Sequence, residues 1–376
     1  MPSVALFSTW FLNPSQTFVW EEIRRHTRYE VEVFTARRLN ADRFPYDRVH
    51  VAGPLFPVTL VSPHFDGVFR RRRFDLVHAH FGNAGTLAMR YASRFGLPLV
   101  VTYHGHDVPL LTSLDRLRPE HWRYALLGRS LLGRLTMALC ASKELRELLI
   151  DIGVPEERVV VHHIGIDVAA FAPGPRDRAR TRVVMIGRFV EKKGFEYGIR
   201  AFARVAGAAP GPHLTIVGDG ERREKLEALV RVLGIVDRVT FAGFLAPAAV
   251  KAELARSDVL LAPSVVSAHG DRESGTIVVK EACASHVVPI GTLHGGIPEI
   301  IEDGATGYLV LERDVDALAD RLARLVADPD LRARMSDAGR AKMEREYDNA
   351  SRVAALEARY DEARERFAAS SRSGRA

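Results

Sequence analysis

The sequence predicts an α/β protein of two domains, each built around a parallel β-sheet. Short apolar runs alternate with longer amphipathic runs along the chain, and this alternation is typical of βαβ units. The pattern stops at 163–181, where Pro, Gly and Arg gather without strand or helix periodicity, and then starts again. A chain of 376 residues, of which 47% are apolar, has the size and composition of two globular domains.

The first half of the chain is expected to form the first sheet. Its strands are predicted at 3–9, 31–36, 75–80, 98–104, 136–141 and 158–162, and its helices at 17–28, 84–95, 116–133 and 142–152. Parallel sheets bind ligands at the carboxyl ends of their strands, so the residues directly after each strand are the first candidates for function. After the first strand comes WFLNPSQTF, in which Ser15 or Thr17 is expected to cap the next helix beside a ligand cleft.

Histidines and one acid follow at the next two strands of this sheet: His78 and His80, then His104, His106 and Asp107. Taken alone, these groups could form the zinc site of a hydrolase. Histidines two residues apart on a strand are common without a metal, because alternation places them on the same face. We therefore favour packed, hydrogen-bonded wall residues for His78 and His80 over a metal site.

The stretch at 163–181 is expected to link the two domains. The predicted boundaries give a first domain at 1–172, a second at 173–349, and a C-terminal segment at 350–376. The C-terminal segment has a helical pattern over 350–368, and its last residues are expected to be disordered.

The second half repeats the alternation. Its strands are predicted at 182–187, 213–217, 238–242, 258–262, 287–291 and 307–310, and its helices at 195–208, 220–234, 247–255, 275–284, 314–327 and 330–346. Asp-x-Asp sequences at 314–316 and 328–330 fall at predicted helix starts. We interpret them as helix caps and not as metal ligands.

The stretch GDRESGTIVVKEACASHVVPIGTLHGGIPE at 270–299 carries the strongest chemical signal. Ser274 is a good N-cap for the helix predicted at 275–284, and Gly275 lets a ligand approach the backbone. The amide groups at the start of such a helix favour a phosphate or a diphosphate.

Two glutamates flank this helix start. Gly275 and Glu281 would lie roughly 9 Å apart along the helix axis, about the length of a diphosphate with a hydroxylated ring at each end. Glu273 and Glu281 would then each accept hydrogen bonds from the hydroxyls of one ring. Taken alone, the pair is more simply interpreted as two solvated glutamates on an amphipathic helix. Because Gly275, the Pro263-Ser264 loop and HGGIPE accompany the pair, we favour the ligand-binding interpretation.

Cations follow the first strand of the second sheet, in the sequence GRFVEKKGF that begins at Gly187. Arg188 and Lys193 can stabilise the negative charge of a leaving diphosphate from this edge. Of the two lysines in the motif, Lys193 is the stronger candidate because it directly precedes Gly194.

These motifs together resemble the retaining, family-4-type glycosyltransferases of the GT-B fold. The resemblance rests on 187–194, on the Pro263-Ser264 loop with 270–299, and on the histidines of the first half. The SQTF and HFG…HGHD sequences are similar to the subgroup of exopolysaccharide, or colanic-acid-type, transferases. Two departures stand out: Ser274 replaces the glycine of most relatives, and SQTF replaces a Gly-Gly pair that approaches the diphosphate.

The resemblance implies a GT-B fold of two Rossmann-like parallel-sheet domains facing a central cleft, with the donor on the second domain and the acceptor on the first. It implies a catalytic group of His104, Arg188, Lys193 and Glu273. The donor-binding residues would be Gly187, Ser274, Gly275, Thr276, Ile277 and Glu281, with Glu281 on the ribose and Glu273 on the donor sugar. Ser15, Thr17, His106 and Asp107 would line the acceptor side.

The resemblance also implies a nucleoside-diphosphate sugar as donor substrate, with no metal and no further cofactor. The acceptor would be a saccharide or lipid-linked saccharide, with a small-molecule natural product as the alternative. A sugar-nucleotide 2-epimerase and a non-catalytic protein that binds nucleotide sugars are the other interpretations of the same fold.

Composition bears on the partners and the location. The formal net charge is +6 and the sharpest basic run is Arg70–Arg73. The run fits contact with an anionic lipid surface or a polyanionic acceptor, but taken alone it favours a solvated face. Aromatic residues do not alternate with these cations, so nucleic-acid binding is not expected. Two cysteines and an N-terminus that reads as a strand, without a basic leader, favour a cytoplasmic protein, which is soluble or at most peripheral at the inner membrane face.

Overall fold

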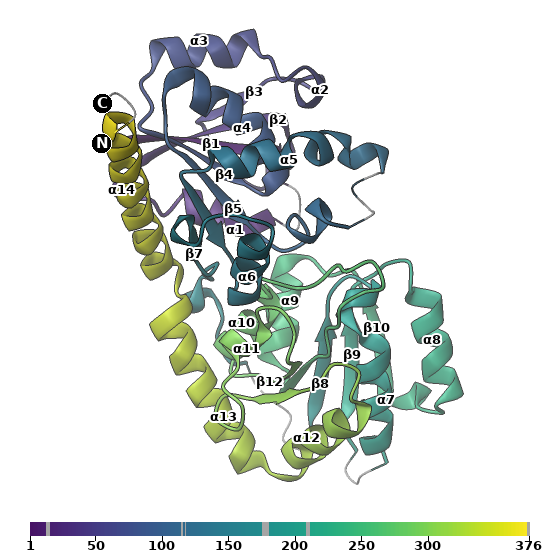
Figure 1. Cartoon of the computed structure of the whole chain (residues 1–376). Helices are drawn as coiled ribbons and strands as arrows, with labels where there is room; N and C mark the ends of the chain where they lie inside the picture. Colours follow the sequence, from purple (N-terminus) through teal and green to yellow (C-terminus); the bar gives the residue numbers. More distant parts are fainter. Residues whose placement is uncertain (13–15, 114–115, 117, 175–179, 208–210, 374–376) are drawn as a thin grey trace. The chain divides into compact units, whose positions relative to one another are not determined.

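The computed structural model describes residues 1–12, 16–113, 116, 118–174, 180–207 and 211–373. It divides into two compact units (Figure 1), the first made of Met1–Gly165 with the segment from Asn349 onward, and the second of Ile166–Asp348. Each unit is built on its own parallel sheet.

The sheet of the first unit has the strand order β3-β2-β1-β4-β5-β6-β7. Its strands are β1 (Ser3–Phe11), β2 (Glu30–Arg38), β3 (Val49–Val51), β4 (Leu76–His80), β5 (Leu99–Tyr103), β6 (Met137–Cys140) and β7 (Val159–Val161). The central strands are buried on both faces, which is why they read as continuous apolar runs. The order places the carboxyl ends of β1, β4 and β5 side by side, at the point where the strand order reverses.

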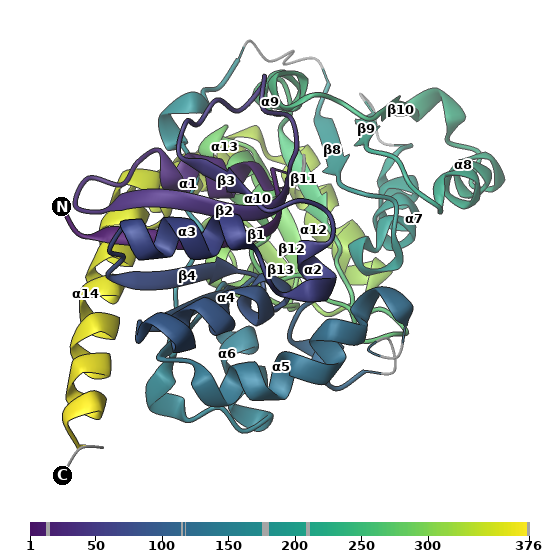
Figure 2. The same ribbon diagram turned by 90° about the horizontal axis from the view of Figure 1, so that it is seen from above.

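Helices cover both faces of this sheet (Figure 2). One face packs on α2 (Phe56–Thr59), α3 (Pro63–Arg71), α4 (Gly82–Phe95), α5 (Trp122–Arg134) and α6 (Lys143–Asp151). The other face packs on α1 (Thr17–Ile23) and on α14 (Asn349–Ser373) from the far end of the chain.

A buried carboxylate fastens α14 to the first unit. Glu357 is 0% exposed and accepts hydrogen bonds of 2.8 Å from the backbone N–H groups of both Thr27 and Arg28. These two amides lie in the connection between α1 and β2, where no helix or sheet ladder pairs the backbone N–H groups. Tertiary hydrogen bonding, and not apolar packing alone, therefore holds the C-terminal helix in place.

The second unit repeats the architecture with the strand order β10-β9-β8-β11-β12-β13. Its strands are β8 (Arg182–Ile186), β9 (His213–Val217), β10 (Val239–Gly243), β11 (Val259–Ala262), β12 (Val288–Thr292) and β13 (Tyr308–Val310). One face packs on α7 (Phe195–Val205), α8 (Arg223–Val232), α12 (Val315–Ala327) and α13 (Pro329–Lys342). The other face packs on α9 (Pro247–Ala255), α10 (Ile277–Ala284) and α11 (Ile297–Ile300).

The structure confirms the predicted strands within a few residues and corrects four other points. It adds β3, α2, α3 and α11, which are short or lie in a stretch that has no strong period. The units divide at Gly165 and Asp348, whereas we predicted 172 and 349, because Ile166 and Val168 pack into the core of the second unit. The last residues through Ser373 are helical where disorder was expected.

The fourth point concerns helix starts. Gln16 and Thr276 occupy the N-cap positions of α1 and α10, where the sequence predicted Ser15 or Thr17 and Ser274. Ser15 lies outside the described residues, and Thr17 is the first residue of its helix. The Asp-x-Asp interpretation is confirmed, because Asp314 and Asp328 cap α12 and α13 through their side chains.

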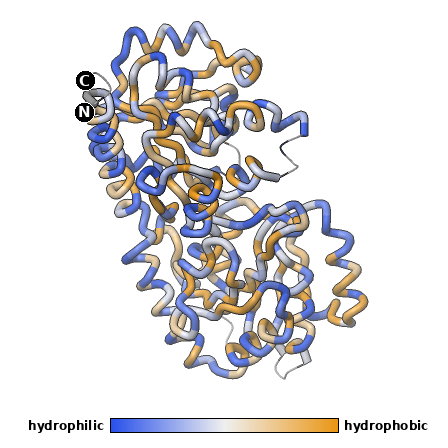
Figure 3. The backbone as a smooth tube through the Cα atoms, in the orientation of Figure 1, coloured by the Kyte–Doolittle hydropathy of each residue, from blue (hydrophilic) through white to orange (hydrophobic). Residues whose placement is uncertain are grey.

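Hydrophobic segments follow the strands in the interior of each unit (Figure 3). Among the described residues, no helix combines the length and the apolar character that are needed to cross a bilayer.

Candidate active site

In the second unit, close backbone packing brings the loops after β8, β9 and β11 together. Gly194 has φ +59°, and a Cβ there would lie 1.9 Å from the carbonyl oxygen of Pro263. Gly218 has φ +134°, and a Cβ there would lie 1.8 Å from the carbonyl oxygen of Gly187. Only glycine fits at such positions. Any other residue would force these loops apart.

The lysines that precede Gly194 bind the carboxylate of Glu273. Lys193 Nζ lies 2.8 Å from Glu273 Oε2, and Lys192 Nζ lies 3.6 Å from Glu273 Oε1. Lys192 also donates to Asp271 and to the backbone carbonyl of Arg272. Although burial acts to raise the pKa of Glu273, the adjacent ammonium groups outweigh it and lower that pKa below 4.5. Glu273 is therefore an ionised, nearly buried carboxylate between two cations.

A second carboxylate holds the backbone of Glu273 through a histidine. The N–H of Glu273 donates to His294 Nε2 at 2.9 Å, and His294 Nδ1 lies 2.7 Å from Glu312 Oε1. The other oxygen of Glu312 accepts from the N–H of Val266 at 3.0 Å. His294 is 2% exposed, so this chain fixes the loop that carries Glu273 from within the core.

Helix α10 begins at Ile277, two residues later than we predicted. Thr276 at its N-cap has φ 25°, a left-handed backbone that a β-branched residue rarely adopts, and its side chain makes no cap hydrogen bond. This turn separates Ser274 and Gly275 from the helix. The first-turn amides that can face an anion are thus those from Ile277 onward.

Glu281 lies one turn further along α10. Burial raises the pKa of its carboxyl to about 7, against the opposing charge of Lys251. A glutamate with such a pKa is poised to ionise when hydrogen-bond donors reach it.

Arg188 directly follows the Gly187 turn, and its side chain is exposed. Within the part of the chain that the structure describes, its guanidinium makes no hydrogen bond or ion pair. Lys193, in contrast, is paired with Glu273. The structure thus brings Lys193 and Glu273 of the predicted catalytic group together and leaves Arg188 free beside them.

In the first unit, His104 lies after β5 with one ring nitrogen engaged. Its Nε2 lies 3.0 Å from His80 Nδ1, and the rings of Phe18 and Phe81 lie 4.9 and 4.4 Å from its own. Burial, and then the neighbouring His80, hold the pKa of His104 well below its usual range. The ring is neutral at physiological pH.

The predicted acceptor-side residues have different surroundings. Asp107 is buried, and its carboxylate accepts from the backbone N–H groups of Gly82, His104 and Gly105 at 3.0, 3.2 and 3.0 Å. It thereby holds the start of α4 and the loop after β5 together. The neighbouring His106 is exposed.

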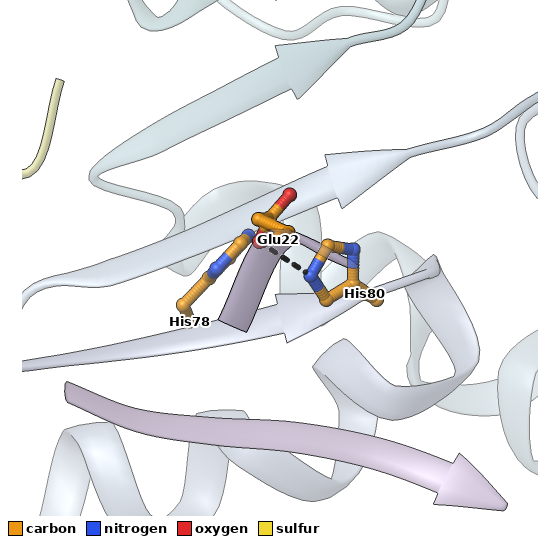
Figure 4. Close-up of side chains that lie close together, drawn as sticks. All are labelled: Glu22, His78 and His80. Carbon is orange, nitrogen blue, oxygen red and sulfur yellow. Dashed lines mark hydrogen bonds and ion pairs between the residues drawn. The ribbon is translucent and has the colours of Figure 1, made fainter. Parts of the chain in front are cut away.

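Glu22, His78 and His80 place three potential metal-ligand atoms within 4.8 Å of one another (Figure 4). Each imidazole is already engaged: His78 bonds the hydroxyls of Thr102 and Tyr360 at 2.8 Å, and His80 bonds Glu22 and His104. A metal would have to break these bonds, so the described contacts favour a hydrogen-bonded cluster.

Sequence reasoning missed Glu22, His294 and Glu312. Glu22 lies mid-helix in a run of charges, and Glu312 lies on a loop that carries no motif. His294 lies in the sequence HGGIPE, which contributes to the family resemblance, but the sequence did not predict a role for the histidine side chain. The sequence offered one indication that Glu312 and His294 could be functional, which is their position directly after the neighbouring strands β13 and β12.

Two units with the Rossmann strand order, one after the other, define the GT-B class of fold. The chain matches the family models described as "Glycosyltransferase Family 4" over residues 17–170 and "Glycosyl transferases group 1" over residues 170–342.

Two curated relatives match over much of their length. A protein of Escherichia coli (strain K12) described as the colanic acid biosynthesis glycosyltransferase WcaL is 32% identical over 280 residues, covering 73% of this chain and 67% of the relative. The GDP-mannose-dependent alpha-(1-6)-phosphatidylinositol monomannoside mannosyltransferase of Mycolicibacterium smegmatis is 30% identical over 351 residues, covering 86% of this chain and 87% of the relative.

Among solved structures, HepE of Anabaena in complex with UDP shares the fold with a TM-score of 0.77 at 18% identity, covering 96% of this chain and 100% of that one. The chain therefore belongs to the family-4-type glycosyltransferases of the GT-B fold, in their exopolysaccharide subgroup. It is a transferase, as the motifs of both halves predicted.

Proposed function

We propose that this glycosyltransferase transfers a sugar from a nucleoside-diphosphate sugar to a hydroxyl acceptor with retention of configuration and without a metal ion. The observation that carries the proposal is the ionised Glu273 held between Lys192 and Lys193, a few residues before α10. A diphosphate that arrives at this helix start competes for the two ammonium groups and finds the free Arg188 beside them. Released from its cations, the Glu273 carboxylate accepts hydrogen bonds from sugar hydroxyls.

The roles of the remaining donor residues follow from chemistry. Arg188 and Lys193 stabilise the charge that develops on the leaving diphosphate, together with the amide groups at the start of α10. Glu281 binds the ribose hydroxyls once it is ionised. Cationic side chains supply the charge that a metal ion supplies in other transferases, which supports metal-independent transfer.

Retention requires that the new bond forms on the face that the leaving group vacates. In the proposed step the bond between the anomeric carbon and the phosphate oxygen breaks, a bond to the acceptor oxygen forms on the same face, and the departing phosphate oxygen takes the acceptor proton. The mycobacterial relative is named for an alpha linkage, and an alpha product from an alpha-linked nucleotide sugar retains the configuration.

We further propose a lipid-linked saccharide as acceptor and an anionic membrane surface as the place of encounter. In the first unit, Leu55 at the start of α2 and Val58 within it are 71% and 61% exposed. Trp122 and Leu126 on α5 are 47% and 71% exposed. The two elements touch, because Arg123 of α5 donates to the backbone carbonyl of Pro57 at 2.8 Å. Arg129, one turn further along α5 from Leu126, is exposed, and an apolar patch beside an exposed cation is the surface that an anionic bilayer attracts.

The first experiment measures thermal stabilisation by UDP, GDP, ADP and TDP, each with and without its common sugars, followed by transfer assays with the nucleotide sugar that binds. Transfer that continues in EDTA and a product with the anomeric configuration of the donor are the expected results. Glu273→Ala and Arg188→Ala should each lower turnover by at least about 100-fold. Near-normal turnover in both variants, or inversion of the anomer, would contradict the proposal.

The assay also separates the alternatives. Conversion of the donor to an isomer without any acceptor would identify a 2-epimerase. Donor binding with neither transfer nor hydrolysis would identify a non-catalytic binding protein. Transfer to soluble natural products but not to lipid-linked saccharides would identify a small-molecule transferase.

Membrane contact is tested by co-sedimentation with vesicles that contain phosphatidylglycerol or only phosphatidylcholine. Leu126→Glu should abolish binding to the anionic vesicles. The matched control is Val232→Glu, because Val232 is 84% exposed on α8 of the other unit. Equal binding of both variants would remove the patch from the proposal.

A further inference from the structure

The second unit carries a basic pocket at the amino ends of β8 and β9, away from the candidate donor residues. Its volume is about 440 Å³, and it is lined chiefly by three arginines, one histidine and two threonines: Arg180, Arg182, Arg256, His213, Thr215 and Thr240. We call it the β8–β10 pocket, because its floor is formed by residues of β8, β9 and β10 (Figure 1).

The pairing of the strands explains why these side chains share one face of the sheet. Arg182 is the register partner of His213, and Thr215 is the register partner of Thr240. Leu214 lies between His213 and Thr215, points to the other face and packs in the core under α7 and α8. Parallel sheets are usually covered on both faces, but here Thr240 is exposed and His213 and Thr215 are half-buried. The helices therefore leave this polar part of the sheet open to solvent.

The pocket holds positive charge that the protein does not neutralise. Within the part of the chain that the structure describes, the guanidinium groups of Arg180 and Arg182 make no hydrogen bond or ion pair. Arg256, in contrast, is paired with the buried carboxylate of Glu253. Burial, and then the charges of Arg180 and Arg182, lower the pKa of His213 below 6.5, so its ring is neutral at pH 7. Two unpaired cations thus lie beside neutral hydrogen-bonding groups.

The chemistry of the lining selects the class of ligand. Guanidinium groups bind the oxygens of a phosphate in a planar, bidentate geometry, and threonine hydroxyls can donate to the same oxygens. His213 Nε2 already lies 2.9 Å from the Thr240 hydroxyl, so these two groups are held together at the floor. Among the described residues that line the pocket there is no carboxylate to repel an anion and no aromatic ring except the imidazole for a sugar to stack on.

We propose that the β8–β10 pocket is a second anion site of this transferase, which binds the phosphate or diphosphate group of a soluble molecule or of a lipid headgroup. The site is separate from the candidate donor site. β8 has five residues, so Arg182 at its amino end lies roughly 16 Å from Gly187, which follows its carboxyl end. The inference goes beyond the proposed function and does not depend on it.

The histidine inside the pocket can report on the ligand. NMR measures the pKa of His213 from the pH dependence of its Cε1–H resonance, which is assigned with His213→Gln. Inorganic pyrophosphate at constant ionic strength is the probe. An anion that neutralises the two guanidinium groups should raise this pKa by about one unit or more. A pKa that excess pyrophosphate leaves unchanged would overturn the proposal.

Arg182→Gln tests the geometry and the site together. Without pyrophosphate it should raise the pKa of His213, because one of the cations that lower it is removed. The further rise on adding pyrophosphate should be lost. Arg200→Gln is the matched control, because Arg200 is exposed on α7, which covers the opposite face of the sheet. It should respond as the wild type does, and equal responses of the two variants would overturn the proposal.

Calorimetry separates this pocket from the candidate donor site. Pyrophosphate should still bind to the Arg188→Ala/Lys193→Ala protein, and adding Arg182→Gln to that protein should weaken the remaining binding at least about tenfold. Transfer by the single variant Arg182→Gln in phosphate-free buffer should equal that of the wild type. Complete loss of binding in the Arg188→Ala/Lys193→Ala protein, or loss of transfer in Arg182→Gln, would show that there is no separate site. Failure of the proposed function would instead appear as absent transfer with the His213 response intact.

Vesicles identify the source of the phosphate group. If a lipid headgroup fills the pocket, Arg182→Gln should co-sediment less than Arg200→Gln with vesicles that contain phosphatidylglycerol. Equal co-sedimentation, together with the response of His213 to pyrophosphate, would assign the pocket to a soluble phosphate compound.

Discussion

At the scale of single residues, the two candidate carboxylates of the second unit differ in charge state. Glu273 is held ionised by Lys193 and Lys192, whereas burial raises the pKa of Glu281 to about 7. Ionised Glu273 is ready for an incoming sugar, while Glu281 must lose a proton before it can accept two hydroxyls.

This difference predicts a pH dependence of donor binding. The free, folded protein favours protonated Glu281, and its carboxylate becomes available as the pH rises through about 7. If the ribose requires the carboxylate, affinity should fall by about fivefold from pH 7 to pH 6 and level off above pH 8. Isothermal titration with a nucleotide sugar, whose phosphates do not titrate in this range, measures the effect.

The control for this titration is Glu281→Gln, which should bind more weakly and show a flat profile. The linked effect on stability has the opposite sign, because a carboxyl with a raised pKa stabilises the folded state at low pH and loses that contribution between about pH 4.5 and pH 7. A wild-type affinity that does not change between pH 6 and pH 8 would contradict the assignment of Glu281 to the ribose.

His294 is the residue whose role depends most on a partner far away in the sequence. His294→Ala removes the acceptor of the Glu273 N–H and the partner of Glu312, so Glu273 should lose its fixed position. We expect kcat to fall by roughly 10- to 100-fold. Steady-state kinetics measure this, with His286→Ala as the control, since His286 is partly exposed and pairs with the exposed Asp337. Equal activities of the two variants would show that the loop holds its position without His294.

At the scale of elements, the turn before α7 is one of the two closest backbone approaches described in the second unit, together with the turn at Gly218. Gly194→Ala would place a methyl group against the carbonyl oxygen of Pro263, in addition to the left-handed backbone. Gly234 has a similar φ of +66° with nothing within 4 Å, so Gly234→Ala isolates the backbone cost of about 1–2 kcal/mol. Gly194→Ala should cost at least about 2 kcal/mol more than Gly234→Ala, measured by urea unfolding followed by circular dichroism. Similar costs for both would mean that the loops after β8 and β11 move apart easily.

At the scale of the whole molecule, each unit has its own hydrophobic core and its own spectroscopic signal. All three tryptophans, Trp10, Trp20 and Trp122, belong to the first unit. Tryptophan fluorescence thus reports on the first unit, while circular dichroism reports on both.

This division predicts how a nucleotide sugar changes thermal unfolding. At 100 times its Kd, the ligand should stabilise the unit that binds it by about 2.7 kcal/mol. Because the proposed donor residues all lie in the second unit, the transition seen by circular dichroism should move to higher temperature and the fluorescence transition should stay. A shift of the fluorescence transition by the same amount would show that the two units unfold together or that the donor binds elsewhere.

The sequence by itself determined the two sheets, the order of their strands and helices, and the candidates His104, Lys193 and Glu273 at the strand ends. These features are local, because periodicity, glycines and helix starts are written in neighbouring residues. Only the tertiary structure decided which of those groups are paired. Glu22, His80 and His104 come from three elements, and Glu312 reaches Glu273 through His294. Hydrogen bonds between buried groups depend on how elements pack and on the water that packing excludes, and no sequence spacing records either.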